Sequence, residues 1–367
     1  MHQPANTSPF SLYLGPCAPG PGGDWRIDLK LAGETVVSAE PELGLLFRCA
    51  EKLFESNSWE QGVTLAERIG FESPLHHALV YCMAVEKAAG AVVPQETETV
   101  RGALCEAERI GSHLGALHNA AAAAGHPASP VIPGWRAGLD SLFQLWGNPA
   151  GFGIMTPGGL RAADGDVLHA AKRFCESLRP GLAEIRRIFL NDPLFCAALR
   201  GAGALTAETA RRAGLSGVNL RCAGETDDVR SSGGYGGYAA ARFAPLAGER
   251  GGQGCALERF SLRVKEIEQS VSLIESACQA ADSGRIKKPV PVFAVPAGEG
   301  YAVCEAPRGR LACYVKSGGG SYPLRVHFTP PSLSAAFACG AVLPGCDFEQ
   351  AVMAAVSLDV SASEADR

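Results

Sequence analysis

The feature of this sequence that most constrains its fold is a helical periodicity that runs with few breaks from about residue 41 to residue 125. Its last segment, TETVRGALCEAERIGSHLGALHNAAAAAG (97–125), places apolar residues three and four positions apart and charged residues on the other side. That spacing predicts a long amphipathic helix with one face in a core. The segment ELGLLFRCAEKLFES (42–56) is also interpreted as helical. We therefore expect a mainly helical body.

The segment SPLHHALVYCMAVEKAAG (73–90) has the strongest helix boundaries in this run. Ser73 suits the N-cap position, where its hydroxyl would accept a hydrogen bond from an unpaired N–H, and Pro74 suits the first helical turn. Gly90 can end the helix in the left-handed conformation. Counting in steps of four, His77 falls on the same apolar face as Tyr81 and Val85. A histidine on the buried side of a helix is either a satisfied core residue or part of a site.

Antiparallel β structure is expected at both ends of the helical run. Residues 10–40 are rich in alternation and turns, and two short strands joined through Ala32-Gly33-Glu34 fit them. Residues 290–330 are interpreted as hairpins. The predicted fold class is α+β, a mainly α-helical body with N- and C-terminal antiparallel β pieces. We divide it into a β-hairpin region (1–40), a helical core (41–289) and a β/α region that closes the site (290–367), all within one structural domain.

Further helices are expected after a break at residues 126–134. The patterns that predict them are amphipathic or apolar segments bounded by turn residues. They lie at residues 135–147, 164–200 (two helices), 256–284, 332–340 and 348–358.

Composition excludes several classes of function. A net charge of −5 and a pI of about 5.9 argue against nucleic acid as a partner. The 13 cysteines are scattered and form no C-x-x-C pair, so we expect reduced thiols in a core and no metal held by this chain. We also expect no direct membrane span, because no uncharged apolar stretch reaches the roughly 18 residues that spanning requires.

Residue chemistry alone leaves two interpretations open. The spacing of three between Arg48 and Glu51, and between Glu106 and Arg109, places each pair on one helical face. Such pairs are either surface ion pairs of small energy or parts of a buried polar network. The glycine-rich stretches RSSGGYGGY and VKSGGGSYP lack the Gly-Lys-Ser/Thr that opens a phosphate-binding helix. They are therefore interpreted as turns.

The order of several fragments carries more information than any one of them. The chain resembles the large subunit shared by membrane-bound, energy-converting [NiFe] hydrogenases and the quinone-pocket (D-type) subunit of respiratory complex I. The resemblance covers nearly the full length and implies the [NiFe]-hydrogenase large-subunit fold. It rests on LGP (14–16), GLLFRCAEKLFE (44–55), AERIGFESPLHHALVYCMAVEKAAGAVVP (66–94), SHLGAL (112–117), LRCAGETDDVRSSGGYGGY (220–238), LERFSLRVKEIEQS (257–270), EAPRGRLACYVKSGGGSYPLRVHF (305–328) and SLDVSASEADR (357–367).

The resemblance fails at the residues that hold a metal in the hydrogenases. Two C-x-x-C pairs hold nickel and iron there, and the corresponding positions in this chain are Gly70, Ser73, Ser361 and Glu364. None is a thiolate, the ligand that such soft metals require. A nickel–iron centre is therefore not expected, and Ser73 is interpreted as a helix cap.

The quinone-protonating residues of complex I are also replaced. The tyrosine that hydrogen-bonds the quinone head corresponds to Phe71, and a histidine-bearing hairpin loop corresponds to residues 17–23, which contain no histidine. A carboxylate and a cluster-side histidine of that family correspond to Ala123 and Gly151. The usual protonation apparatus is therefore not expected.

Other family residues are retained, and the resemblance implies a role for each. His77, Asp359 and Arg68 are the candidate catalytic residues, with His77 and Asp359 handling protons. Arg48, Glu51, Phe71 and Ser73 are the candidates to face a cofactor or acceptor; Arg48 and Arg68 match arginines near a partner's iron–sulfur cluster. Further retained residues are Arg109, Arg221, Asp228, Arg230, Glu305, Asp366 and Arg367.

The resemblance implies a large subunit of a membrane-associated redox complex. The chain itself would bind no cofactor; a small iron–sulfur subunit would exchange electrons with it, and quinone or another small molecule would be the acceptor. Membrane-anchor and antiporter-like subunits would hold it on the cytoplasmic side of the inner membrane. The alternative is a non-catalytic scaffold that keeps the assembly contacts and has lost the chemistry.

Overall fold

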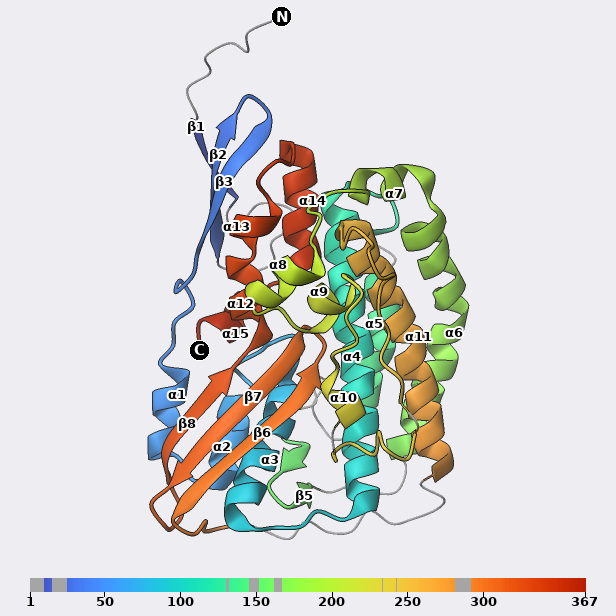
Figure 1. Ribbon diagram of the computed structural model, residues 1–367. Coiled ribbons are helices and arrows are strands. Elements are labelled where there is room, and N and C mark those ends of the chain that lie inside the picture. Colours follow the sequence, from blue (N-terminus) through green and yellow to red (C-terminus); the bar gives the residue numbers. More distant parts are fainter. Residues whose placement is uncertain are drawn as a thin grey trace, which may run out of the picture.

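The computed structural model describes residues 10–14, 25–129, 132–144, 152–161, 167–232, 234–241, 243–280 and 292–367. A bundle of long helices lies beside two three-stranded antiparallel sheets, one near each end of the chain (Figure 1). This arrangement confirms the predicted α+β class.

The N-terminal sheet has three strands where two were expected. Strands β1 (Phe10–Leu14), β2 (Arg26–Ala32) and β3 (Thr35–Glu42) pair antiparallel in the order β1-β2-β3. The β2–β3 turn lies at the expected place, where Gly33 has a φ of 64°. Alternation buries Leu29 and Leu31 against the C-terminal helices. The sheet thereby gains a core of its own.

The long helices form the body of the molecule. Helices α4 (Gln95–Ala123) and α11 (Ala256–Ala280) lie side by side, and α5 (Ile132–Gln144) and α6 (Val167–Asn191) pack against them (Figure 1). Helix α5 begins three residues before the expected start, and the last residues of its predicted span lie outside the described residues.

Helix α3 and the C-terminal sheet pack face to face. Helix α3 (Pro74–Ala89) begins and ends as predicted, with Gly90 left-handed at a φ of 65°. Strands β6 (Gly298–Ala306), β7 (Gly309–Ser317) and β8 (Pro323–Thr329) form an antiparallel meander over it (Figure 1). The approach is so close that a Cβ at Gly300 would lie 2.1 Å from the Ala84 carbonyl oxygen. Only glycine fits at this crossing.

Short elements connect these layers and follow the last sheet. They are α1 (Ala50–Leu53), a 3-10 turn (Phe54–Ser56), α2 (Trp59–Ala66), β4 (Met155–Thr156), β5 (Gly159–Leu160), α7 (Pro193–Leu199), α8 (Ala207–Arg212), α9 (Gly217–Arg221), α10 (Val229–Ser232), α12 (Pro331–Phe337), α13 (Cys339–Val342), α14 (Phe348–Leu358) and α15 (Ala362–Ala365).

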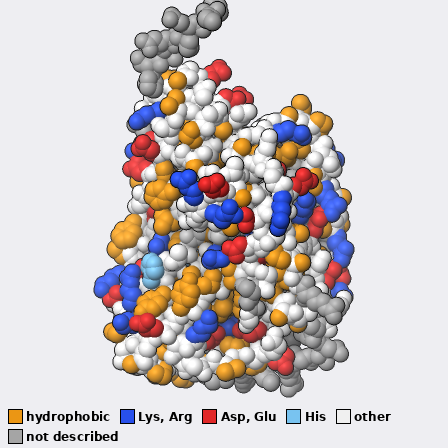
Figure 2. Space-filling model, viewed as in Figure 1, with side chains coloured by type: hydrophobic (Ala, Val, Ile, Leu, Met, Phe, Trp, Pro, Cys, Tyr) orange, Lys and Arg blue, Asp and Glu red, His pale blue; other side chains and the backbone are white. Residues whose placement is uncertain are grey.

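The surface and the core follow the expected chemistry. Charged side chains of both signs are interspersed with hydrophobic ones on the face that carries the C-terminal sheet (Figure 2). Of the described cysteines, Cys49 is exposed, Cys278 is partly buried and the rest are buried, all as free thiols. Burial raises the pKa of the Cys304 thiol, so it packs as a small apolar residue.

Candidate functional site

Two chain segments that are far apart in the sequence meet between α2 and the C-terminus. One is the loop 68–73 that leads into α3, and the other is residues 359–364, which follow α14 and include the first three residues of α15. Arg48 joins them, because its Nη2 donates to the carbonyl oxygens of Arg68 (3.2 Å), Ile69 (3.4 Å) and Ser363 (3.0 Å). We call the residues gathered here, 68–77, 308, 359–364 and Arg48, the junction site.

Side chains also cross between the two segments. The Phe71 N–H donates to Ser363 Oγ at 3.3 Å, and the Ser361 hydroxyl donates to Glu72 Oε2 at 2.7 Å. Burial alone would raise the pKa of Glu72, but Arg308 and the Ser361 hydroxyl hold it below its ordinary value. Glu72 is therefore a carboxylate at neutral pH.

His77 lies at the bottom of the junction site and fills its interior. The side chain is 0% exposed, and a Cβ placed on Gly70 would lie 2.2 Å from the imidazole Cε1. The ring thus occupies the space that any side chain at position 70 would need. Its Nδ1 lies 2.9 Å from the Ser73 carbonyl oxygen, and its Nε2 lies 3.8 Å from Glu364 Oε2.

Ser73 is at the N-cap position of α3, but its hydroxyl makes no capping hydrogen bond. The expected cap is therefore wrong. Glu108 of α4 takes this role instead, since its two carboxylate oxygens accept from the N–H groups of Leu75 (2.7 Å) and His76 (3.0 Å). Glu108 Oε2 also lies 2.6 Å from His76 Nδ1. A charged acceptor from a neighbouring helix satisfies the first turn better than a hydroxyl does.

Asp359 joins the junction site from the C-terminal end of α14. Its φ of 54° is left-handed, an uncommon conformation for a non-glycine residue. Arg308 fixes it by donating from Nε to the Asp359 carbonyl oxygen (2.9 Å) and from Nη2 to Oδ1 (3.3 Å). Arg263 approaches the other oxygen, Oδ2, at 3.9 Å. Arg308 therefore lies between Asp359 and Glu72, whose Oε2 is 3.9 Å from its Nη1.

The exposed rim of the junction site is cationic and aromatic. Phe71 is 54% exposed, and the Arg48 guanidinium lies 5.2 Å from its ring centre. Arg68 is exposed beside it, hydrogen-bonded to the Thr64 carbonyl oxygen at 2.8 Å and 5.5 Å from the Phe152 ring. The structure thus brings Arg48, Arg68 and Phe71 to the surface, with His77 and Ser73 buried beneath.

Glu51 does not pair with Arg48, contrary to the helical spacing, because helix α1 begins only at Ala50 and Arg48 precedes it. Glu51 contacts basic side chains of the C-terminal region instead: Arg325 (2.7 Å), His327 (3.0 Å) and Arg367 (2.9 Å). It ties the chain terminus to β8 and lies outside the junction site.

A second group of charges is buried between α4, α10 and α11. Glu106 accepts hydrogen bonds from Tyr238 (2.6 Å) and Ser270 (2.5 Å) and pairs with Arg109 (3.3 Å) and Arg230 (3.2 Å). Burial alone would raise its pKa, but the two arginines lower it to about 2. The Glu106–Arg109 spacing therefore belongs to a buried polar network and not to a solvated face.

Arg221 extends this network toward the C-terminal sheet. It pairs with Glu266 (2.6 Å), Glu305 (2.6 Å) and Asp228 (3.2 Å), all buried. Arg221, Asp228 and Glu305 are retained residues of the sequence motifs, whereas the sequence did not single out Glu266. Truncating one member would leave an uncompensated buried charge, so the network holds these elements in one arrangement.

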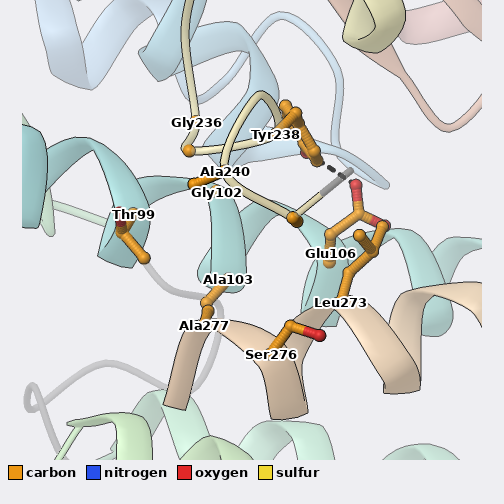
Figure 3. A pocket seen from close by; sticks show the side chains of 12 residues that line it. Thr99, Gly102, Ala103, Glu106, Gly236, Tyr238, Ala240, Leu273, Ser276 and Ala277 are labelled. Atoms are coloured by element: carbon orange, nitrogen blue, oxygen red, sulfur yellow. Dashed lines mark hydrogen bonds between the residues drawn. The ribbon is translucent and has the colours of Figure 1, made fainter. Parts of the chain in front are cut away.

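A small cavity of about 70 Å³ lies against this network (Figure 3). Tyr238 and Glu106 close one end, and the other walls are mainly small residues of α4, α11 and the 236–241 loop. Its lining is Thr99, Gly102, Ala103, Glu106, Gly236, Gly237, Tyr238, Ala240, Ala241, Leu273, Ser276 and Ala277. None of these belongs to the junction site, and the polar atoms of Glu106 are already paired.

Glu67 is a polar residue of this region that the sequence did not single out. It is 1% exposed at the end of α2, and its Oε1 accepts from the Gly153 N–H at 2.5 Å. Burial raises its pKa to about 7 against the opposing effect of that hydrogen bond and of Arg68. The only sequence signal was its place next to Arg68, which does not report burial.

Some expectations lie beyond what the structure describes. The loop 17–23 and Gly151 are outside the described residues. Among those that are described, no group of three or more His, Cys, Asp or Glu side chains is arranged to hold a metal ion. In the same residues, no helix combines the length and apolarity needed to cross a bilayer.

Comparison with known proteins agrees with this architecture. The family model of the 49-kDa subunit of respiratory-chain NADH dehydrogenase matches residues 139–294 and 287–367. The D subunit of the NADH-quinone oxidoreductase of Carboxydothermus hydrogenoformans is 32% identical over 98% of this chain and 99% of that protein. The corresponding subunit of Thermus thermophilus is 30% identical over 98% of this chain and 95% of its own length.

A solved structure shows the same fold over the whole chain. It is a chain in the structure of the membrane-bound sulfane sulfur reductase, an archaeal respiratory membrane complex. The TM-score is 0.90 with 28% sequence identity, and the match covers 100% of both chains. With relatives at 30% identity or more over nearly the full length, this chain belongs to the family of the 49-kDa, or D-type, subunit of respiratory-chain NADH dehydrogenases.

Proposed function

We propose that the chain is the large subunit of a membrane-bound respiratory complex, in which an iron–sulfur subunit delivers electrons to a quinone at the rim of the junction site. The relatives are named as D subunits of NADH-quinone oxidoreductases, which supports the reaction class and the acceptor. Partner subunits that span the membrane would hold the chain peripherally on the cytoplasmic side of the inner membrane.

One observation carries this proposal: Arg48 holds both segments of the junction site while its guanidinium also covers the exposed ring of Phe71. Arg68, whose carbonyl oxygen accepts a hydrogen bond from Arg48, adds a second, exposed cation whose guanidinium lies against the Phe152 ring. Preorganised cations stabilise negative charge that develops on a reduced cluster or acceptor. An exposed aromatic face offers a flat apolar acceptor a surface to stack against.

Proton chemistry would come from beneath the rim. Quinone reduction consumes two protons with two electrons, so the acceptor site needs proton-handling groups close by. His77 and Asp359 are those groups in this proposal. Both are buried, and Arg308 holds Asp359 at the junction site.

The residues at the junction site do not fit a nickel–iron centre. Gly70 has no side chain, and the space for one is filled by His77. The Ser361 hydroxyl donates a hydrogen bond to Glu72, and Glu364 accepts one from the Ser332 N–H. Thiolate sulfur, the donor that such a centre requires, is absent from all four positions. We therefore derive no step through such a centre and expect no nickel in the purified complex.

The filled interior favours a second candidate, a non-catalytic scaffold that retains only the assembly contacts. If the imidazole of His77 blocks every approach to the buried groups, the rim could bind a partner without any acceptor. The two functions differ in whether the rim residues affect turnover beyond their effect on assembly.

The test uses the purified membrane-bound complex. The iron–sulfur signal of the partner is recorded by electron paramagnetic resonance with and without quinone, and quinone reduction is measured in parallel. We expect R68A and H77A to lower turnover at least tenfold and to reduce the quinone-dependent change of the signal. The control is R187A, which removes an exposed arginine of α6 that pairs with Glu184 of the same helix.

Unchanged turnover and signal in both variants, with normal assembly, would support the scaffold. Polysulfide is assayed beside quinone, because the structural relative is named as a sulfane sulfur reductase. Reduction of polysulfide but not of quinone would overturn the choice of acceptor while leaving the site in place.

A further inference from the structure

The imidazole of His77 is held as a defined tautomer. Its Nδ1 lies 2.9 Å from the Ser73 carbonyl oxygen, which can only accept a hydrogen bond. Nδ1 therefore carries the hydrogen in the neutral ring, and Nε2 presents a lone pair. Among the described residues, Nε2 has no hydrogen-bond partner although the side chain is fully buried.

Glu364 is oriented so that one carboxylate oxygen faces this lone pair. Its Oε1 accepts from the N–H of Ser332 (3.1 Å) and from the Ser332 hydroxyl. The other oxygen, Oε2, also lacks a hydrogen-bond partner among the described residues, and it lies 3.8 Å from His77 Nε2. Glu364 is 0% exposed. Two buried acceptors thus face each other with no hydrogen between them.

Unpaired buried acceptors are costly, and a single proton would satisfy both of these. Protonation of Nε2 turns the facing acceptors into a charge-assisted hydrogen bond, and a closure of about 1 Å brings the atoms to a normal distance. Ser332 fixes the carboxylate from one side, and Ser73 fixes the imidazole from the other. Each group is held in place by its second partner.

Charges of both signs surround the pair on the elements that pack against it. Glu72 and Arg308 face it from the loop before α3 and from the turn between β6 and β7, and His76 precedes it on α3. Asp359 is bound to Arg308, and the Phe328 ring of β8 lies 6.1 Å from the His77 ring. Among these neighbours the two carboxylates, Glu72 and Asp359, outnumber the one arginine, Arg308, so an added proton is tolerated.

We infer that His77 and Glu364 form a proton-storage site, which takes up one proton from water and holds it as an Nε2–H···Oε2 hydrogen bond. No bond other than N–H forms, and no electron is transferred. That this proton is then delivered to a reduced acceptor rests on the proposed function; the proton binding itself does not. The role of Glu364 is thus to position and stabilise the proton that His77 Nε2 holds.

The pH range follows from the environment of His77. Burial lowers its pKa below 6.5, and Glu364 offsets only part of that effect. His77 is therefore neutral at pH 7.5, and it gains its proton only at a pH below the ordinary histidine range. Removing the charge of Glu364 removes the offset, so less of the site is protonated at any given pH.

Nuclear magnetic resonance of the full-length chain with ¹⁵N-labelled histidine tests this. The signal of His77 among the 8 histidines is assigned by its loss in H77Q. We expect the Nδ1–H tautomer at pH 7.5 and protonation of Nε2 on acidification. In E364Q the midpoint should fall by about one pH unit or more, because an adjacent opposite charge shifts a pKa by that amount.

E72Q is the matched control, since it removes a carboxylate that faces the same site without approaching Nε2. The shift in E72Q should be smaller than that in E364Q, and the signal of the partly exposed His327 should not change in either variant. Finding the hydrogen on Nε2 at pH 7.5, or an unchanged midpoint in E364Q, would overturn the inference. If E364Q does not fold, the tautomer of His77 in the wild-type chain tests the inference: a hydrogen on Nδ1 at pH 7.5 supports it, and a hydrogen on Nε2 overturns it. None of these readouts requires turnover, so they stand apart from the test of the proposed function.

Discussion

At the scale of single residues, burial decides which carboxylates are charged. Glu106 and Glu67 are equally inaccessible, 1% exposed each, yet their pKa values differ in opposite directions from the ordinary value. Glu106 pairs with two buried arginines, whereas Glu67 accepts only one hydrogen bond that the described residues provide, from Gly153. Desolvation therefore dominates at Glu67.

This difference predicts how stability depends on pH. The pKa of Glu67 rises from 4.5 to about 7 on folding, so its contribution to stability is full below pH 4.5 and is lost as the pH rises through 7. The loss amounts to about 3 kcal/mol. E67Q keeps an acceptor for Gly153 without titrating, so its urea-unfolding free energy should fall less between pH 5 and pH 7.5 than that of the wild type. If the unfolding free energies of E67Q and the wild type depend on pH in the same way, the prediction is wrong. The control is E60Q, which changes an exposed glutamate of α2.

At the scale of the element, the start of α3 is determined by another helix. Ser73 and Pro74 mark the boundary in the sequence, but the N–H groups of Leu75 and His76 are satisfied by Glu108, which lies 32 or 33 positions further along the chain. The helix begins where the sequence indicates, and it is capped by a residue that local patterns do not reveal.

Truncation distinguishes the two residues. E108A leaves two buried N–H groups unpaired, and it should lower the free energy of unfolding by about 3 kcal/mol. S73A removes no capping hydrogen bond, and it should cost less than about 1 kcal/mol. Denaturant unfolding of both variants measures the difference. A larger loss in S73A than in E108A would show that the hydroxyl is the cap after all.

At the scale of the whole molecule, we propose that the C-terminal residues close the junction site. Asp366 accepts hydrogen bonds from the N–H groups of Gly44 (2.8 Å) and Leu46 (3.0 Å), and Arg367 binds Glu51. These contacts join the last residues to the segment that carries Arg48, which lies far earlier in the sequence. Figure 1 shows the C-terminus beside α15, between the two sheets.

Loss of this closure should be local. D366A removes both acceptors, so the amides of Gly44, Leu46 and residues 361–365 should exchange hydrogen faster, by roughly tenfold or more. The amides of β7, which lie in the middle of the C-terminal sheet, should be unchanged. Hydrogen exchange followed by mass spectrometry measures both regions. If the amides of Gly44, Leu46 and residues 361–365 exchange at the wild-type rate in D366A, the proposed closure is wrong.

Many elements and part of the candidate site could be predicted, because they depend on local chemistry. The helix over 73–90 and the helix over 348–358 follow from periodicity and turn residues, and the β2–β3 turn follows from Gly33. The resemblance identified the segments around Arg68 and Asp359. It did not identify Glu67 or Ser332, which hydrogen-bonds Glu364, since burial and contact depend on what packs above a residue.

The sequence by itself determined the α+β class, the main helices and the absence of thiolates at positions 70, 73, 361 and 364, because each is a property of neighbouring residues or of residue identity. Only the tertiary structure decided that Glu108 caps α3, that Glu51 binds the chain terminus and that His77 fills the space above Gly70. The physical reason is that a hydrogen bond or a steric contact needs proximity in space. Residues far apart in the sequence gain that proximity only when the chain has packed.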